Sequence, residues 1–416
     1  MKKTIFTLSA IVALAFTGCM NDEAPPILQD TNNQDNSGDN TVSVSGMISE
    51  STTWTNNTIY VLNQKVVVSS GVVLTIQAGT IIKGTEGTGS LASALIVAKG
   101  GKLNATGTAT EPIIFTSIND NITVGQTSGT NLDETNSGLW GGLIVLGNAP
   151  CSFSGDVEVL QIEGIPADDT FGLYGGSDAA DDSGVYQYIS IRHGGALIGE
   201  GNEINGLTLG GVGSGTVIEN IEVVGNVDDG IEFFGGTVNA SNLLIWAQGD
   251  DALDIDQAYS GTINNAVVIL GANSDHAFEI DGPEGAATGA FTLNNVTIIG
   301  NSVTEDGEYA DYRSGAMGST ENIYAYGFKE TSDVELDNDG VATNYNNGLL
   351  TFGAWEIVLP SGVSDVASIF VNKASAVEVS GFGSTATAVT EGVNTVGATT
   401  SLLSWTYANS KAGLGF

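Results

Sequence analysis

The sequence predicts an all-β protein built as a single solenoid, and three observations lead to this prediction. The chain has 416 residues, of which 57 are glycine and only 14% are charged. Short runs rich in Val, Ile and Thr are separated by glycine, a pattern typical of strands and tight corners rather than of helices. Similar segments also follow one another with a period in the low twenties, which is the period of stacked β-coils.

The repeated segments can be read directly from the sequence. Each opens on a threonine and then contains one of the stretches VDDGIEF, GDDALDI and SDHAFEI, which align position for position. The first aspartates of these stretches, Asp228, Asp250 and Asp275, are 22 and 25 residues apart. We therefore expect three successive coils whose aspartates line up along one edge of the solenoid.

The N-terminal half carries further coil-like stretches, GVVLTIQAGTIIKG, ALIVAKGGKLNATGT and GTATEPIIFTS. They resemble the opening coils of right-handed parallel β-helix proteins. This resemblance implies that residues 46–416 form one right-handed parallel β-helix of about a dozen coils, with side loops and a C-terminal cap. The tail TSLLSWTYANSKAGLGF is expected to lie over the last open coil, because solenoids need caps that prevent edge pairing.

The N-terminus predicts export from the cytoplasm. A basic start is followed by an apolar stretch and by small residues before Cys19, which fits a secretory signal over residues 1–18 better than a spanning helix. The FTGC ending resembles the lipobox of bacterial lipoproteins and implies a lipid on Cys19; the alternative is an ordinary signal with a chance cysteine. The MNDE that follows resembles the signal by which Bacteroidetes-type bacteria send lipoproteins to the outer surface of the outer membrane. As a whole, the chain resembles uncharacterised surface β-helix lipoproteins of that group.

Charge restricts the partners of the mature protein. Removal of residues 1–18 takes away two lysines and no acid, which leaves 9 basic against 48 acidic residues and a formal charge of −39. Nucleic acid is excluded by repulsion, whereas cations and neutral ligands are not. Residues 19–45 are polar and acidic, and they are expected to form a flexible tether between the membrane and the solenoid.

The aligned repeats also predict a metal site. Equivalent residues of neighbouring coils lie about 4.8 Å apart, and two bare carboxylates at that distance repel by roughly 3–4 kcal/mol at an effective dielectric constant of 20. Ca²⁺ would relieve this repulsion, because it binds clustered carboxylate and carbonyl oxygens. A solvated acidic ridge and a shared proton are the alternatives. The expected calcium ligands are Asp228, Asp229, Asp250, Asp251 and Asp275 at the corner, with Glu232, Asp254 and Glu279 as a second group.

A catalytic interpretation competes with the metal site. The order VDDG, GDDA, SDHA and DYRSG resembles the motifs on successive coils of polygalacturonase-type glycoside hydrolases. That resemblance implies a polysaccharide hydrolase or lyase with Asp229, Asp250, Asp251, His276 and Arg313 as catalytic residues. The sequence departs from the family pattern in three places: Asp228 replaces a threonine, Ser274 and Asp275 displace the glycine before His276, and no lysine follows Arg313 as required.

The predicted function is that of a surface-anchored β-helix module. It would be calcium-stabilised and either bind a ligand, such as a glycan, alone or with an outer-membrane transporter, or serve a purely structural role. Four aromatic residues could stack on sugars or belong to the core, namely Trp140, Trp246, Tyr259 and Trp355. His276 is expected to hydrogen-bond Asp251, His193 to be structural, and Cys151 to be a buried small hydrophobe.

Overall fold

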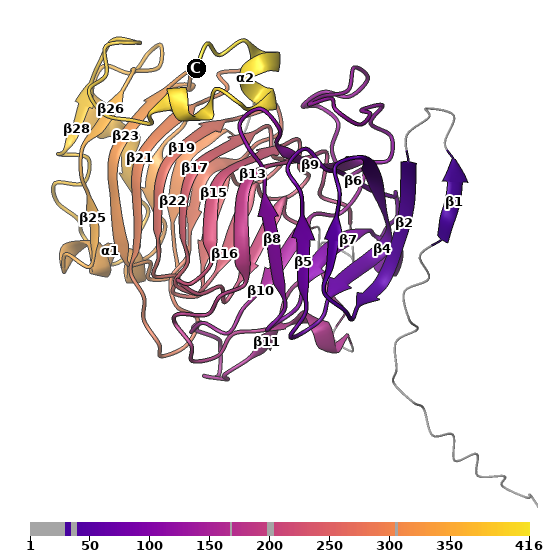
Figure 1. Cartoon of the computed structure of the whole chain (residues 1–416). Helices are drawn as coiled ribbons and strands as arrows, with labels where there is room; N and C mark the ends of the chain where they lie inside the picture. The colour runs from indigo at the N-terminus through magenta and orange to yellow at the C-terminus, as the bar shows by residue number, and fades with distance from the viewer. Residues whose placement is uncertain (1–29, 35–39, 167–168, 198–203, 304–306) are drawn as a thin grey trace, which may run out of the picture.

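The computed structural model describes residues 30–34, 40–166, 169–197, 204–303 and 307–416. It is a single right-handed parallel β-helix, whose coils stack from the indigo strands at the N-terminal end to the yellow and orange strands at the other (Figure 1). Each coil contributes strands to three parallel sheets, which we call the first, second and third sheets. The predicted signal peptide and Cys19 lie outside the described residues.

Within the described residues, the first sheet is a ladder of eleven parallel strands. They are β2 (Asn40–Ile48), β4 (Thr58–Val68), β7 (Ala94–Val97), β10 (Leu143–Leu146), β14 (Leu207–Gly210), β16 (Ile231–Phe234), β18 (Leu253–Asp256), β20 (His276–Ile280), β22 (Glu308–Tyr312), β24 (Val334–Leu336) and β27 (Phe370–Asn372).

The second sheet contains β3 (Thr52–Trp54), β5 (Val73–Ile76), β8 (Lys102–Thr106), β13 (Gly184–Arg192), β15 (Val217–Val224), β17 (Asn239–Trp246), β19 (Thr262–Ile269), β21 (Phe291–Ile299), β23 (Gly318–Tyr326) and β25 (Leu350–Phe352). The five long strands from β13 to β21, and β23 after them, bend at a corner and continue into the third sheet. That sheet also contains the first parts of β2 and β4, with β6 (Ile81–Gly84), β9 (Ile113–Ser117), β26 (Trp355–Ile357) and β28 (Ala386–Ala388).

The remaining elements are short. β1 (Asp30–Gln34) pairs antiparallel with β2, and β11 (Leu160–Gln161) pairs antiparallel with β12 (Leu173–Tyr174) in a side loop. The helices are α1 (Asp339–Asn346) and α2 (Tyr407–Ala412), with 3₁₀ turns at Gly89–Leu91, Thr170–Gly172, Val366–Ile369 and Thr400–Leu403. Within the described part of the chain, no helix is long and apolar enough to span a bilayer.

Stacked side chains fill the inside of the coils. In the first sheet the inward column reads Leu95, Leu143, Leu207, Ile231, Leu253, Phe278, Ala310, Val334 and Phe370, all of them buried. Neighbouring residues of a strand point to opposite faces, so the next position along each strand points away from the core. This alternation determines which side chains the first sheet presents on its outside.

An asparagine column makes the corner between the second and third sheets. Asn220, Asn242, Asn265, Asn295 and Asn322 occupy equivalent positions and have φ between 56° and 65°. Asparagine tolerates this left-handed conformation better than most residues do. Hydrogen bonds between the side-chain amides link adjacent coils, for example from Asn265 Nδ2 to Asn242 Oδ1 at 2.8 Å.

Two expected boundaries need correction. Strand β2 begins at Asn40, so the end of the predicted tether is already paired with β4 and belongs to the solenoid. The tail at 400–416 does cover the coils, but along their flank and not over the last open coil. The amide of Ala408 donates to Glu222 Oε1 at 2.7 Å, and the amide of Thr399 donates to Asn265 Oδ1 at 2.6 Å.

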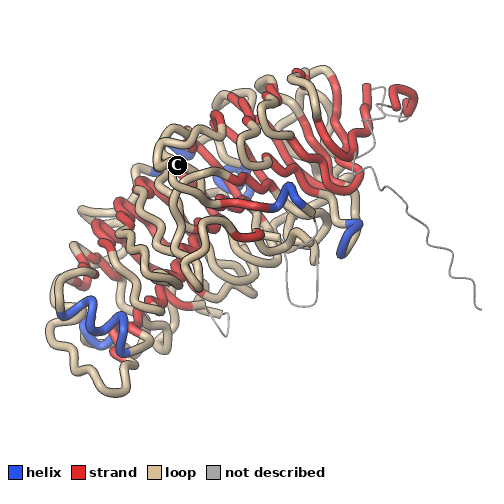
Figure 2. Tube along the Cα trace, turned by 90° about the horizontal axis from the view of Figure 1, so that it is seen from below, coloured by secondary structure: helices blue, strands red, loops and turns tan. Residues whose placement is uncertain are grey.

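The physical reason is an apolar stripe on the outside of the third sheet. Leu403, Tyr407 and Ala408 pack there against the outward residues Leu244 and Val267 and their neighbours. Both views place the C-terminus against the flank of the solenoid (Figures 1 and 2). The last coil is filled instead by an aromatic cluster near α1, made of Tyr345, Phe352, Trp355, Phe370 and Phe382.

Candidate functional site

The outside of the first sheet carries a continuous column of five carboxylates. Glu232, Asp254, Glu279, Asp311 and Glu335 are paired in register on consecutive strands, one position after the inward apolar column. Thr208 precedes them and Val371 follows them. Strand pairing thus forces these like charges into one line, and Glu232, Asp254 and Glu279 are the three that the repeat alignment predicted.

A second column lies at the corner where the third sheet turns into the first. Asp229 Oδ1 accepts a hydrogen bond from the amide of Asp251 at 2.9 Å. Asp251 Oδ1 in turn accepts from the amide of His276 at 2.9 Å and lies 2.8 Å from His276 Nδ1. The predicted contact between His276 and Asp251 is therefore present, and Asp229, Asp251 and His276 form a ladder of hydrogen bonds from coil to coil.

The corner aspartates follow the predicted register. Because Ile231 pairs with Leu253 and Leu253 with Phe278, the positions three residues earlier, Asp228, Asp250 and Asp275, are also equivalent. The amide of Asp275 donates to the carbonyl of Asp250 at 3.0 Å, as expected between adjacent coils.

Basic side chains neutralise the later coils of the acidic face. Arg313 contacts the carboxylates of Glu279 and Asp281, with 2.8 Å between its Nη2 and Asp281 Oδ2. Lys373 contacts Glu335 in the same way. Burial disfavours the protonated ring of His276, but the hydrogen bond and charge of Asp251 outweigh it and raise the pKa of His276 to about 9. This histidine is therefore a cation at neutral pH.

The earlier coils have no such partner. One oxygen each of Asp229, Glu232 and Asp254 lie within 4.8 Å of one another. Among the residues that the structure describes, no Lys, Arg or His comes within 4.0 Å of these three carboxylates. Asp229 and Glu232 are only 6% exposed, whereas Asp254 is half-buried. Burial, and then the charges of neighbouring acids, hold the pKa of all three well above the ordinary range.

A second acidic group overlaps the first through a shared residue. Oxygens of Asp228, Asp229 and Asp250 also lie within 4.8 Å of one another. Burial and the charges of Asp251 and Asp275 raise the pKa of Asp250 to about 6. Five of the eight predicted calcium ligands thus gather around Asp229.

The other three predicted ligands lie around His276. One ligand atom each of Asp251, His276 and Glu279 lie within 4.8 Å of one another and form a separate group. Asp275 Oδ1 lies 3.7 Å from His276 Nδ1. The structure therefore divides the predicted ligand set into one part around Asp229 and one part around His276, which is itself a cation.

The alternative catalytic set is divided in the same way. Asp229, Asp251 and His276 are linked by hydrogen bonds, and Asp250 belongs to the group around Asp229. Arg313 is held by Glu279 and Asp281 on the side of the later coils. A histidine that is protonated at neutral pH can serve as an acid or a counter-ion there, but not as a base.

Several residues of the acidic face do not follow from the sequence motifs. Asn205 Nδ2 donates to Glu232 Oε2, and Asn205 Oδ1 is buried with no partner among the described residues. Asp311 and Glu335 extend the column, and Lys373 neutralises its end. The register of HAFEI with EYADY and of ADY with VEL would have located both acids, but a loop of variable length interrupts the repeat before each.

The aromatic residues belong mainly to the core. Trp140, Tyr259 and Trp355 are fully buried, whereas Trp246 is 8% exposed and borders a pocket. His193 is buried and its Nδ1 lies 2.9 Å from the carbonyl of Asn136, which agrees with a structural role. Cys151 is half-buried and not fully buried as expected, and burial raises the pKa of its thiol to about 12.

These features define the class of the protein as a single parallel β-helix with an acidic face on one sheet. The chain belongs to the family of pectate-lyase-like beta helix domains, whose model matches residues 46–409. No curated protein matches its sequence. Among solved structures, it is similar to a pectin methylesterase from Aspergillus niger, with 13% identity and a TM-score of 0.31, over 81% of this chain and 87% of the other.

A second solved structure is tailspike protein 2 from Escherichia coli O157:H7 bacteriophage CAB120. It has 10% identity and a TM-score of 0.23, over 76% of this chain and 34% of the tailspike. The family model assigns the β-helix domain, and neither solved structure assigns an activity to this chain.

Proposed function

We propose that the protein is a lipid-anchored module of the outer cell surface that holds a divalent cation, Ca²⁺, at its acidic corner. The observation that carries this proposal is the group of Asp229, Glu232 and Asp254, whose oxygens converge where no basic side chain of the described chain reaches. Repulsion among buried carboxylates destabilises the fold unless a proton or a cation is bound. The cation would let these coils stack and would present one face of the solenoid to a ligand.

Calcium suits the available donors. The group offers carboxylate oxygens only, and neither a cysteine nor a histidine belongs to it. Hard oxygen donors select Ca²⁺ or Mg²⁺ over softer metals, and Ca²⁺ accepts the larger and less regular set of ligands. The unpartnered oxygen of Asn205, on the side chain that already contacts Glu232, is a further donor of the same kind.

The melting temperature of the Asp250→Asn variant, with and without excess calcium, tests the cation site. Without calcium, the variant should melt higher than the wild type at neutral pH, because one of the mutually repelling charges of Asp228, Asp229 and Asp250 is gone. With calcium, the wild type should gain stability and the variant should gain less. Glu321→Gln removes the same charge from an exposed position on another sheet and is the matched control. If calcium does not change the melting temperature of the wild type, the acidic corner is only a solvated ridge and the cation site is wrong.

The anchor is supported by the FTGC sequence at Cys19, and surface display by the acidic MNDE that follows. On this proposal the solenoid binds a glycan or works beside an outer-membrane transporter. Nucleic acid is excluded as a partner because the acidic protein would repel its phosphates. Cys19→Ala should move the protein from the membrane fraction to the soluble fraction. If the variant still sediments with membranes, the lipid anchor is wrong.

A hydrolase or lyase is the second candidate function. Two acidic side chains favour it, because burial raises the pKa of Asp250 to about 6 and that of Asp256 to about 7, which suits general acid catalysis near neutral pH. Release of reducing ends or unsaturated products from polysaccharides, lost in Asp250→Asn, would favour the enzyme. Calcium-dependent melting without any such release favours the binding module.

A further inference from the structure

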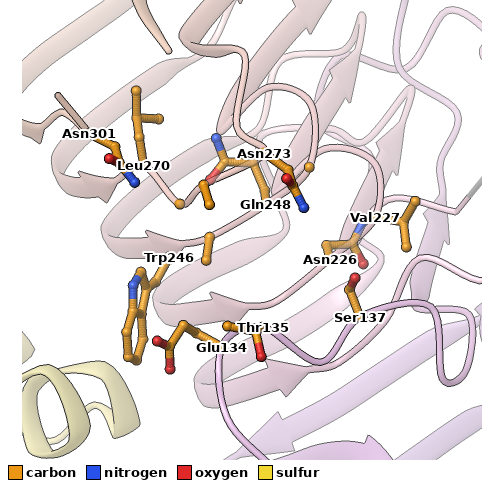
Figure 3. A pocket seen from close by; sticks show the side chains of 14 residues that line it. Glu134, Thr135, Ser137, Asn226, Val227, Trp246, Gln248, Leu270, Asn273 and Asn301 are labelled. Atoms are coloured by element: carbon orange, nitrogen blue, oxygen red, sulfur yellow. The ribbon is translucent and has the colours of Figure 1, made fainter. Parts of the chain in front are cut away.

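A pocket of about 570 Å³ lies at the corner between the third and first sheets, lined in part by residues that directly precede the corner aspartates in sequence. The turns that follow β15, β17 and β19 form its floor, and the loop at 134–137 forms its outer wall. Figure 3 shows Trp246 at one end, Asn226 and Ser137 at the other, and Gln248 and Asn273 on the wall between them. Its volume is within the range of about 300–1,000 Å³ that is typical of small-molecule sites.

The wall of this pocket combines neutral polar and apolar side chains. Amides, hydroxyls and apolar side chains such as Val227 and Leu270 line it, together with one carboxylate, Glu134, and its described lining residues include no Lys, Arg or His. Asn226 and Gln248 are 2% and 1% exposed, and the side-chain oxygen of each has no hydrogen-bond partner within the described residues. Buried acceptors of this kind are normally satisfied, so each lacks a donor that a ligand could bring.

The two amides are held in fixed orientations by their nitrogens. Asn226 Nδ2 donates to the carbonyls of Ile204 and Asp229 at 3.0 and 2.9 Å. Gln248 Nε2 donates to the carbonyls of Asp250 and His276 at 3.3 and 3.4 Å. Because both side-chain nitrogens already donate hydrogen bonds, the two side-chain oxygens remain available only as acceptors. They lie on two neighbouring coils.

We propose that this pocket binds a neutral saccharide unit of a glycan. Sugar hydroxyls would donate to the two amide oxygens, and the part of Trp246 that borders the pocket would contact apolar carbons of the sugar ring. The inference rests on the proposed binding function and gives it a location and a class of ligand. It uses none of the carboxylates of the cation site.

Other ligand classes fit less well. An anionic sugar or a phosphate would meet Glu134 and a chain of formal charge −37, with no basic side chain in the wall. A cation would find one carboxylate and not the six to eight oxygens that calcium prefers. An apolar ligand would bury the amides of Asn226 and Gln248 without giving them donors.

Calorimetric titration with cellotriose, maltotriose, mannotriose and xylotriose tests the inference, with trigalacturonate as the acidic counterpart. We expect at least one neutral trisaccharide to bind with a Kd of about 1 mM or lower, and trigalacturonate not to bind. Ser137→Trp should fill the pocket and weaken binding by about tenfold or more. The exposed Asn273→Ala should weaken it without disturbing the fold, and Thr351→Trp on an exposed strand position elsewhere is the control.

Each titration is repeated with excess calcium and with a chelator. Binding that both pocket variants weaken supports the saccharide site, whether or not calcium changes the melting temperature, so the two proposals can fail separately. Two results would overturn the inference. One is that no neutral trisaccharide binds the wild type; the other is that binding survives unchanged in Ser137→Trp and Asn273→Ala.

Discussion

Asp229 connects the two acidic groups of the corner. Its Oδ1 accepts from the amide of Asp251, so this oxygen is fixed by the next coil, while the carboxylate also lies within reach of Glu232 and Asp254 on one side and of Asp228 and Asp250 on the other. A bound cation at this residue would neutralise both groups at once. Among the described residues, no Lys, Arg or His lies within 4.0 Å of the carboxylates of Asp229, Glu232 and Asp254, which is why the proposed site is placed here.

His276 provides a direct test of the internal neutralisation on the next coil. The folded state raises its pKa to about 9, against 6.5 for an unperturbed histidine. Its protonation should therefore stabilise the fold fully below about pH 6.5 and should lose that effect as the pH rises through about 9, with a maximum of roughly 3 kcal/mol. Urea unfolding of wild type and His276→Gln across this range measures the difference.

The difference in the free energy of unfolding between wild type and His276→Gln is expected to narrow as the pH rises. Asp251 remains beside the substituted residue at every pH, so the part of the gap that depends on pH reports the protonation of the ring. A gap that stays constant, or that widens toward high pH, would show that His276 is not the counter-ion of Asp251.

At the scale of elements, the asparagine corner sets the bend between the second and third sheets. Asn295 has φ of 58°, and its Nδ2 donates to Asn264 Oδ1 at 2.8 Å. Asn295→Ala should destabilise the fold by about 1–3 kcal/mol, because it loses the hydrogen bond and places an alanine in the left-handed region. Asn295→Gly keeps the conformation but not the bond, so denaturant melts should place it between alanine and wild type. If glycine is the more damaging, backbone conformation is not the reason for the asparagine column.

The repeat predicted the coils from Thr216 to Thr292 well, because equal spacing and alternation fix both the register and the outward face. The N-terminal coils followed from resemblance, and the structure confirms them as parallel strands. The asparagines of the corner are visible in the same repeats, where each is followed by an apolar residue in the pairs NI, NL, NA and NV. Nothing in the sequence shows, however, that these asparagines adopt the left-handed conformation. The tail lies along the flank because Ala408 donates a hydrogen bond to Glu222 and because an apolar stripe faces outward there. Neither contact can be predicted from the sequence alone.

The candidate site was only partly predictable for a similar reason. Alignment located the carboxylates of three coils, since these coils have nearly equal length. It could not locate Arg313 and Lys373 as the basic partners of the later coils, because loops separate both from the acids they contact. The folded chain, and not the repeat alone, thus determines which carboxylates have no basic side chain beside them. This criterion selects Asp229, Glu232 and Asp254 from the eight predicted ligands.

For the molecule as a whole, the distribution of charge connects fold and function. The chain carries 48 acidic against 11 basic residues, and the solenoid stacks part of this excess into columns where neighbouring acids cannot separate. Salt can screen exposed charges, but it acts much less on buried ones. The stability of the body should therefore respond strongly to a cation that enters the corner and only weakly to monovalent salt.

Calorimetric titration of calcium into the solenoid, at about pH 5 and about pH 8, tests the central claim most directly. The carboxylates of the corner have raised pKa values and must lose their protons before they bind a metal, so the affinity should increase with pH and binding should release protons into the buffer. Glu232→Gln, which keeps the shape of the protonated side chain, should abolish this binding, and Glu321→Gln should leave it unchanged. Absence of binding at about 1 mM calcium and high pH, or equal binding by wild type and Glu232→Gln, would contradict the account.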